Sequence, residues 1–268
     1  MNAVALVADD SDLEGHVEIV VRSDGSGGSF YPTLRSSGAL AVRATIDGVS
    51  LVGASAHPIG GDRLRVDIEV GPDARLSVQS ASATLARGSN PAVASRMEFA
   101  ALVKKGGALH WAPEPGIAAH ESTHVCDTAV SLGSTSSLCW CDAIVLGRFG
   151  EDAGSWESRL RVEVEGLPLV VSALAMGSAH PAWSSPAVLG GARCSHNITV
   201  VEPGRQAPFP ITLANSGYVV PLSECALQIV TWGSTFLESR AALRSLLANP
   251  LLSEWMDGSL GRVSIDLS

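Results

Sequence analysis

The feature that most constrains the fold of this chain is a strict alternation of apolar and charged residues. The segment "RLRVDIEV" (63–70) places aliphatic residues on one side and charged residues on the other, and "RLRVEVEGLPLVV" (159–171) begins with the same pattern. A period of two with one charged face is typical of a β-strand that has one face in water. We therefore predict half-exposed strands at both places. Their similarity indicates either two strands that obey the same rule or an internal duplication.

Similar segments recur along the chain, separated by turn-forming residues. "GPD" (71–73) predicts a turn that leads into a second strand region, 74–86. Further strands are predicted at 16–22, 40–45, 97–103, 108–111, 138–146, 196–202 and 226–231. Clusters of Gly, Ser and Pro at 23–29 and 178–191 are predicted to be loops, the second one inside a domain. We expect an all-β fold of two stacked sheets in one domain over residues 1–268, with a few helices mainly near the C-terminus.

One helix is predicted at about 235–248. Thr235 and Glu238 fit a capping box, in which the two side chains accept hydrogen bonds from free N–H groups of the first turn. An apolar stripe follows at helical spacing, and Asn249-Pro250 ends the segment. The stripe consists of Phe236, Leu243, Leu246 and Leu247. We interpret it as a contact with the sheet, and a partner-docking face is the alternative.

The composition excludes several classes of protein. The net charge is −9 and no long run of Lys or Arg is present, so a nucleic-acid-binding surface is not expected. The N-terminus lacks the basic region of a signal peptide, and no window of 18 apolar residues predicts a membrane span. With five cysteines and no export signal, we expect reduced thiols and a cytoplasmic protein.

The amount of apolar surface is the second point that the composition raises. Charged residues make up 17 % of the chain and apolar residues 46 %. The mean hydropathy is positive, at +0.24. Such values are compatible with a β-rich protein that has a large core. They are equally compatible with a protein part of whose apolar surface is covered by a partner.

The segment His120-Glu121-Ser122-Thr123-His124 matches the H-E-x-x-H pattern of zinc peptidases. That chemistry requires a helix, where side chains four residues apart lie on one face and reach one metal ion. Nearby prolines and β-branched residues oppose a helix, so we expect an exposed strand without zinc. A zinc metallohydrolase remains an alternative function, as does a β-sandwich recognition module. Cys139 and Cys141 would share one face of a strand, either as a soft metal site or as two reduced thiols.

Four segments in order resemble one family. "PIGGDRLRVDIEVGPDARLSVQSASATLA" (58–86) resembles the Gly-Gly-Asp-Arg-Leu segment and following strands of the urease accessory protein UreD, also called UreH. "LHWAPEPGIAA" (109–119) resembles its Trp-x-Pro-Glu-Pro segment in the actinobacterial form. "CDAIVLGRFGEDAG" (141–154) and "RLRVEVEGLPLVVSALAMG" (159–177) resemble its Leu-Gly-Arg turn and the next strand. The resemblance covers roughly residues 40 to 250.

The resemblance implies a scaffold without catalytic activity of its own. Its partners would be apo-urease, the helical accessory protein UreF and, through UreF, the nickel-carrying GTPase UreG. Nickel would be in transit through an internal passage, with no tightly bound cofactor. Oxygen ligands suit such a hand-over because they bind Ni²⁺ less tightly than His or Cys clusters do.

The resemblance also suggests three positions along the passage: Asp62, Thr84 and Asp142. Each has a structural alternative. Asp62 would be a turn carboxylate that accepts backbone hydrogen bonds beside Gly60-Gly61. Thr84 would be an ordinary strand residue. Asp142 would form a buried ion pair with an Arg such as Arg148.

Overall fold

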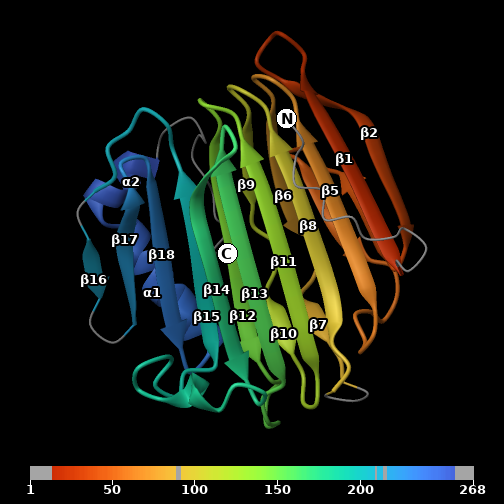
Figure 1. The fold of residues 1–268 in the computed structure, drawn as a ribbon, viewed down its shortest axis with the longest axis vertical. Coiled ribbons are helices and arrows are strands. Elements are labelled where there is room, and N and C mark those ends of the chain that lie inside the picture. Colours follow the sequence, from red (N-terminus) through yellow and green to blue (C-terminus); the bar gives the residue numbers. More distant parts are fainter. Residues whose placement is uncertain (1–13, 89–91, 209, 214–215, 257–268) are drawn as a thin grey trace.

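The computed structural model describes residues 14–88, 92–208, 210–213 and 216–256. Two β-sheets stack face to face, and two helices near the C-terminus lie against the outer side of one of them (Figure 1). The predicted all-β, two-layer fold with C-terminal helices is confirmed. Because the expected single domain includes residues outside the described part, that expectation stays a prediction.

The first sheet has seven strands in the order β14-β13-β11-β8-β5-β1-β2. Its strands are β1 (Gly15–Ser23), β2 (Ser29–Gly38), β5 (Arg63–Val70), β8 (Ser95–Val103), β11 (Thr123–Leu132), β13 (Ser155–Val164) and β14 (Leu167–Gly177). The five inner strands run parallel to one another, and β2 and β14 pair antiparallel at the two edges.

The second sheet has eleven strands, nine of them in the order β16-β17-β18-β15-β12-β9-β6-β4-β3. These are β3 (Leu40–Ala44), β4 (Val49–Gly53), β6 (Arg75–Ser80), β9 (Ala108–Trp111), β12 (Ser137–Leu146), β15 (Cys194–Val201), β16 (Ile211–Leu213), β17 (Gly217–Ser223) and β18 (Ala226–Gly233). The short strands β7 (Thr84–Ala86) and β10 (Gly116–Ala118) complete it, with β10 pairing both β7 and β12.

In the middle of the chain, successive strands alternate between the two sheets. It runs from β5 to β6, from β8 to β9, from β11 to β12 and then to β13, changing sheet at each step. The turn predicted at 71–73 is present, but the strand that follows it lies in the other sheet. The similar segments at 63–70 and 159–171 are out of register across the sheet. Arg65, the third residue of the first segment, lies level with Arg159, the first residue of the second, and the pairing between them runs through Glu98 and Asp127. This offset favours two strands that obey the same rule.

The main core fills the space between the sheets. Strand β5 alternates as predicted, with four buried aliphatic side chains inside and four partly exposed charged side chains outside. Trp111 and Trp140 are among the largest fully buried side chains, and their rings stack with centroids 4.6 Å apart. Period-two patterning therefore gives each strand one face for the core and one for the outside.

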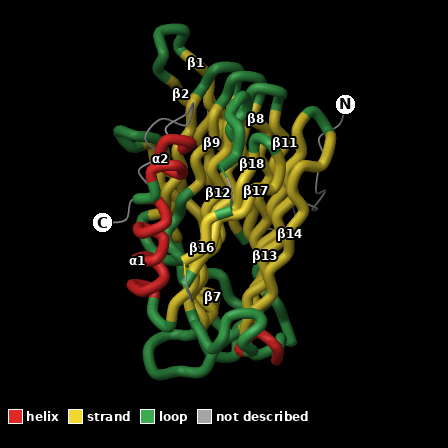
Figure 2. Tube along the Cα trace, turned by 90° about the vertical axis from the view of Figure 1, so that its left-hand side faces the viewer, coloured by secondary structure: helices red, strands yellow, loops and turns green. Residues whose placement is uncertain are grey.

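The helices form a second core on the outer side of the eleven-stranded sheet (Figure 2). Helix α1 (Phe236–Leu247) begins at the predicted cap, where the Thr235 hydroxyl accepts a hydrogen bond from the backbone N–H of Glu238. Helix α2 (Pro250–Met256) follows directly. Pro250 ends the first helix as expected, but it also starts the second one, since the first turn of a helix tolerates proline. Helix α2 was not predicted from the sequence.

Several strands were also missed, among them β2, β4, β16 and β17. Strand β2, "SFYPTLRSSG", carries Pro32 and few apolar residues, a composition that an edge strand tolerates. The 178–191 segment lies inside the fold as expected, since β12 before it pairs with β15 after it, and it contains a short 3₁₀ helix, Pro181–Ser184. Among the described residues no helix is long and apolar enough to span a membrane.

Candidate functional site

A cavity of about 320 Å³ lies between the two sheets. Its lining includes side chains of β5, β8, β11 and β13 on one side and of β7, β10 and β12 on the other. The rings of Phe99, Trp111 and Trp156 form much of its apolar wall. Trp156 lies so close to Gly116 that a Cβ there would come within 2.1 Å of the ring, so this position of β10 requires glycine. The close contact between Gly116 and Trp156 is therefore part of the packing of the two sheets around the cavity.

Asp142 lines this cavity from β12. Burial raises the pKa of its carboxyl to about 6, although a hydrogen bond from the Trp140 indole, over 3.2 Å, opposes the rise. The ion pair with Arg148 that the sequence left open is not formed. Arg148 pairs instead with Glu151, three residues away in the same turn, at 2.8 Å. A carboxylate thus faces a largely apolar cavity, and it becomes ionised near neutral pH.

Thr84 lines the same cavity from β7. Its backbone N–H donates to the carbonyl of Pro115 over 3.0 Å, which holds β7 beside the segment leading into β10. Ser158 of β13 lines the cavity from the opposite sheet. The structure therefore brings two of the three predicted passage residues, Thr84 and Asp142, to one cavity.

Asp62 lies in the turn before β5, and its carboxylate is engaged within that turn. It accepts a hydrogen bond from the backbone N–H of Ile59 over 2.6 Å and contacts Nδ1 of His57 at 2.5 Å. His57 lines the cavity. Asp62 does not line the cavity, but its carboxylate contacts His57. The structural alternative for Asp62, a turn carboxylate, is therefore confirmed, and its link to the cavity runs through His57.

The H-E-x-x-H segment does not form a zinc site of the peptidase type. His120 and Glu121 are exposed in a turn, and His124, the second residue of β11, has a completely buried side chain. Nδ1 of His124 lies 2.8 Å from the hydroxyl of Ser95, and its ring packs on Trp156 at 4.4 Å. Burial lowers the pKa of His124 to about 3, so the imidazole is neutral. The expected absence of a helix is confirmed, but the expected exposed strand is wrong, because β11 begins within the core.

Cys139 and Cys141 lie on the face of β12 that packs towards the helices. Both side chains are buried as free thiols, and burial raises the pKa of Cys139 to about 12. The pKa of Cys141 is also well above its usual value, chiefly because of burial. Neutral thiols are poor metal ligands, which supports the interpretation as two reduced thiols in a sheet. Among the described residues no group of three or more His, Cys, Asp or Glu is arranged to hold a metal ion.

The helical stripe belongs mainly to the second core. Leu243 and Leu246 are fully buried against β-strand residues, Leu247 is partly buried, and Phe236 is half-buried against His196. The interpretation as a contact with the sheet is confirmed. Leu243 and Leu246 are therefore not on the surface that an incoming protein would meet. The most exposed large apolar side chain of α1 is Leu237, at 74 %.

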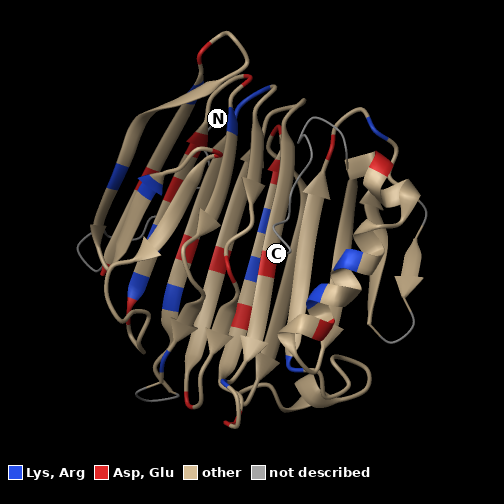
Figure 3. Ribbon diagram, turned by 180° about the vertical axis from the view of Figure 1, so that it is seen from behind, with Lys and Arg blue, Asp and Glu red and all other residues tan. Residues whose placement is uncertain are grey.

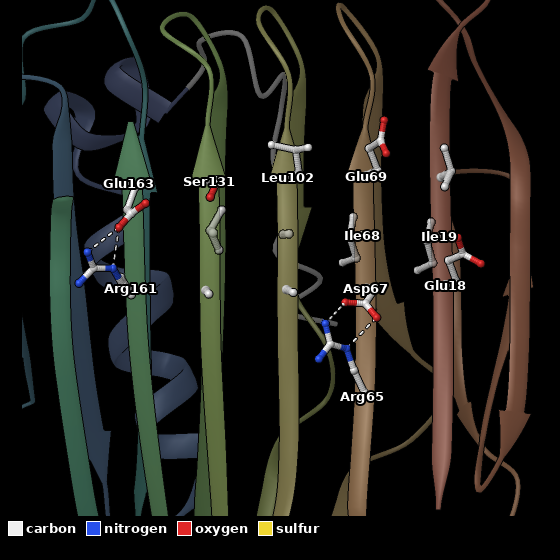
Figure 4. Close-up of a pocket in the computed structure, with 15 residues that line it drawn as sticks. Glu18, Ile19, Arg65, Asp67, Ile68, Glu69, Leu102, Ser131, Arg161 and Glu163 are labelled. Carbon is white, nitrogen blue, oxygen red and sulfur yellow. Dashed lines mark hydrogen bonds and ion pairs between the residues drawn. The ribbon is translucent and has the colours of Figure 1, made fainter. Parts of the chain in front are cut away.

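The outer face of the seven-stranded sheet is a second feature of functional interest. Charges of both signs alternate along its strands (Figure 3). They pair with one another, as Arg65 does with Asp67 and Arg161 with Glu163 on either side of a shallow groove of about 270 Å³ (Figure 4). Parallel sheets usually have both faces covered, but the two described helices pack on the outer side of the other sheet. Within the described residues this face is free for another molecule.

Two further residues of the cavity lining, His57 and Glu114, were not predicted from the sequence. No motif in the sequence marks His57 as a site residue. Glu114 lies in the Trp-Ala-Pro-Glu-Pro segment, and the two prolines that flank it were a signal of an interrupted strand.

Comparisons with known proteins agree with the resemblance. The family model described as "UreD urease accessory protein" matches residues 13–250. A urease accessory protein UreD of Streptomyces avermitilis is 35 % identical over 239 residues, covering 86 % of this chain and 95 % of the relative. A UreD of Streptomyces coelicolor is 34 % identical, covering 88 % and 96 %. A UreD of Frankia casuarinae is 35 % identical, covering 86 % and 78 %.

Proposed function

The chain belongs to the UreD family of urease accessory proteins, and we propose that it serves urease maturation as a scaffold without catalytic activity of its own. In this proposal it binds apo-urease and a UreF-like protein in the cytoplasm, and a UreG-like GTPase reaches it through the UreF-like protein. Nickel is cargo, and no cofactor is tightly bound. The observation that carries the proposal is the cavity that places Asp142 and Thr84 together between the sheets.

The chemistry of this cavity suits a metal ion in transit. A water needs roughly 10–15 Å³ of such volume, so the cavity has room for an ion with part of its hydration shell. Asp142 offers a carboxylate oxygen, Thr84 a hydroxyl, and His57 a nitrogen near the edge. Oxygen ligands bind Ni²⁺ more weakly than a cluster of imidazoles and thiolates would, so the ion can leave again. The buried thiols of β12 face away from this cavity, and burial raises the pKa of the Cys126 thiol, which lines the cavity from β11, well above its usual value.

Partner binding is supported by the surfaces that the chain leaves open. The outer face of the seven-stranded sheet carries ion pairs that already neutralise one another, so covering it does not strand single charges. A stable contact needs about 800 Å² from each partner, and a sheet of this size can provide it.

The alternative functions have less support. A zinc hydrolase needs both imidazoles of the H-E-x-x-H segment at one ion, but one lies in an exposed turn and the other in the core. A recognition module for sugars would use a group of exposed aromatic rings, and among the described residues the exposed aromatic side chains are those of Phe30 and Phe149.

The direct experiment is urease activation in a heterologous urease operon with and without this gene. We expect active, nickel-loaded urease only when the gene is present, and co-purification of the chain with the UreF-like protein. If urease reaches full activity and nickel content without the gene, the proposal fails. A zinc-dependent peptidase activity of the pure chain would favour the hydrolase instead.

A further inference from the structure

The cavity between the sheets has the size and the wall of a site for a small organic molecule. Its volume, about 320 Å³, lies within the range of roughly 300–1,000 Å³ that is usual for small-molecule sites. An apolar cavity of about 150 Å³ is already large enough to bind benzene. The rings of Phe99, Trp111 and Trp156 line the cavity together with aliphatic side chains from both sheets. An aromatic ring with a short side chain therefore fits between the two sheets.

The cavity opens to the solvent beside two loops. Gly53, Ser55 and Ala56 line it where the chain leaves β4, and Ser82 lines it between β6 and β7. All four residues are exposed. Because a residue that is both exposed and part of the lining lies at the mouth, these loops mark an entrance. Their small side chains do not narrow it.

One carboxylate oxygen at the wall of the cavity lacks a hydrogen-bond donor. Asp142 lies between Trp140 and Ile144 on the face of β12 that points to the other sheet. Its Oδ1 accepts a hydrogen bond from the Trp140 indole over 3.2 Å. Within the described residues, no protein donor pairs with Oδ2. Polar groups in protein interiors are nearly always hydrogen-bonded, so a molecule that donates to Oδ2 would be stabilised in the cavity.

The charge of Asp142 also lacks a counter-ion. Burial raises the pKa of its carboxyl to about 6, so the group is ionised at neutral pH. Across the gap Cys126 stays neutral, because burial, together with the nearby charge of Asp142, raises the pKa of its thiol. The other titratable residues of the lining are His57, Arg87 and Glu114, and none of these described residues forms an ion pair with Asp142. A positively charged molecule is therefore the occupant that suits this cavity.

We propose that this cavity binds small organic ammonium ions that carry an aromatic ring. The ammonium group donates a charge-assisted hydrogen bond to Oδ2 of Asp142, and the ring is buried against Phe99, Trp111 and Trp156. A firmly held metal ion would need three or more ligand groups, which the described residues do not bring together. An organic ammonium ion needs one carboxylate and the apolar wall. This binding goes beyond the proposed function and does not depend on nickel transfer.

The test measures binding of three probes to the full chain by isothermal titration calorimetry at about pH 7.5. We expect benzylammonium to bind one to one with a dissociation constant below about 1 mM. Benzyl alcohol lacks the charge and methylammonium lacks the ring, so each should bind at least about tenfold more weakly. Equal binding of benzyl alcohol would overturn the role of the carboxylate. Equal binding of methylammonium would overturn the role of the aromatic wall, and either result would overturn the proposal.

A pair of variants locates the charge that the probe meets. Asp142→Asn should weaken the binding of benzylammonium at least about tenfold, because the amide carries no charge. Asp127→Asn is the matched control, since Asp127 lies on the outer face of the other sheet, where it pairs with Arg96 and Arg159. It should bind the probe as the wild type does. Circular dichroism verifies that both variants fold.

Two measurements on the wild type do not depend on any variant. Lowering the pH from about 7.5 to about 5 should weaken the binding about tenfold, because Asp142 becomes protonated while benzylammonium keeps its charge. The ¹⁵N-labelled indole signal of Trp140 should shift on binding, since this N–H donates to Asp142.

The outcomes separate this site from the proposed function. Absence of saturable binding by the wild type, or full binding by Asp142→Asn, would overturn the ammonium site. Neither result bears on urease activation, which is measured with and without the gene and needs no organic ligand.

Discussion

Asp142 is the residue whose proposed function, as an ionised carboxylate in the cavity, conflicts most clearly with the stability of the fold. Its side chain is partly buried at the cavity wall and receives a hydrogen bond from the Trp140 indole, yet burial still raises the pKa of its carboxyl to about 6. An ionised carboxylate at neutral pH is therefore a cost to the fold. Carboxyl groups with a raised pKa of this kind are typical of functional sites, where the group serves binding or chemistry and not stability.

Replacing Asp142 with Asn should stabilise the protein at neutral pH. The folded-state pKa, about 6, lies above the ordinary value of 3.8, so the cost is absent below about pH 4 and complete above about pH 6. Removing the charge should then add about 2–3 kcal/mol to the free energy of unfolding at neutral pH. Urea unfolding at about pH 5 and about pH 7.5 measures this. A gain that does not grow with pH, or a loss of stability, would contradict the assignment.

The two histidines of the H-E-x-x-H segment should behave differently from each other. His120→Ala removes an exposed side chain and should change the free energy of unfolding by less than about 0.5 kcal/mol. His124→Ala leaves a hole beside Trp156 and removes the hydrogen bond between the imidazole and the Ser95 hydroxyl, so we expect a loss of about 2–3 kcal/mol in the free energy of unfolding. Thermal unfolding and metal analysis check both variants. Loss of stoichiometric zinc in both would revive the zinc site.

At the residue scale, the three passage positions were predicted only from the resemblance to a family. Asp142 and Thr84 do meet in one cavity, although they are far apart in the chain. The suggested partner Arg148 was wrong because Glu151 is closer to it in the same turn. His57 and Glu114 were missed because their relation to the cavity depends on how the two sheets stack.

At the scale of elements, periodicity predicted where most of the strands lie. It identified the inner and outer faces of β5 correctly, because side chains alternate along any strand. It could not say that β5 leads to a strand in the other sheet, since a period of two holds no information on which strands pair. The alternation of successive strands between the two sheets is therefore seen only in the structure.

Helix α1 shows how burial decides the effect of a substitution. Leu243→Asp places a charge in the second core, where the leucine is completely buried, so we expect a loss of more than about 3 kcal/mol. It is thus a poor probe of partner binding. Leu237→Asp changes a side chain that is 74 % exposed and should leave the fold intact. Circular dichroism and urea unfolding of the two variants check this, and equal stabilities would mean that α1 does not pack as described.

At the scale of the whole molecule, two stacked sheets hold a largely apolar cavity into which Asp142 brings a carboxyl group, and within the described residues they leave one sheet face open to another protein. The open face and the low share of charged residues, 17 %, agree with a chain that works in a complex. In the proposed function, the chain holds its partners together while an ion passes between its sheets. Both parts must hold for the account to be correct, and the second can be tested with the complex assembled.

The most direct test is the nickel content of urease matured by complexes that differ at one carboxylate. Asp142→Asn changes a carboxylate in the cavity, and Asp127→Asn changes one on the outer face of the other sheet, where it pairs with Arg96 and Arg159. With gel filtration showing equal assembly, we predict normal nickel per active site for wild type and Asp127→Asn, and a strong deficit for Asp142→Asn. Full nickel content in urease matured with Asp142→Asn would contradict the account.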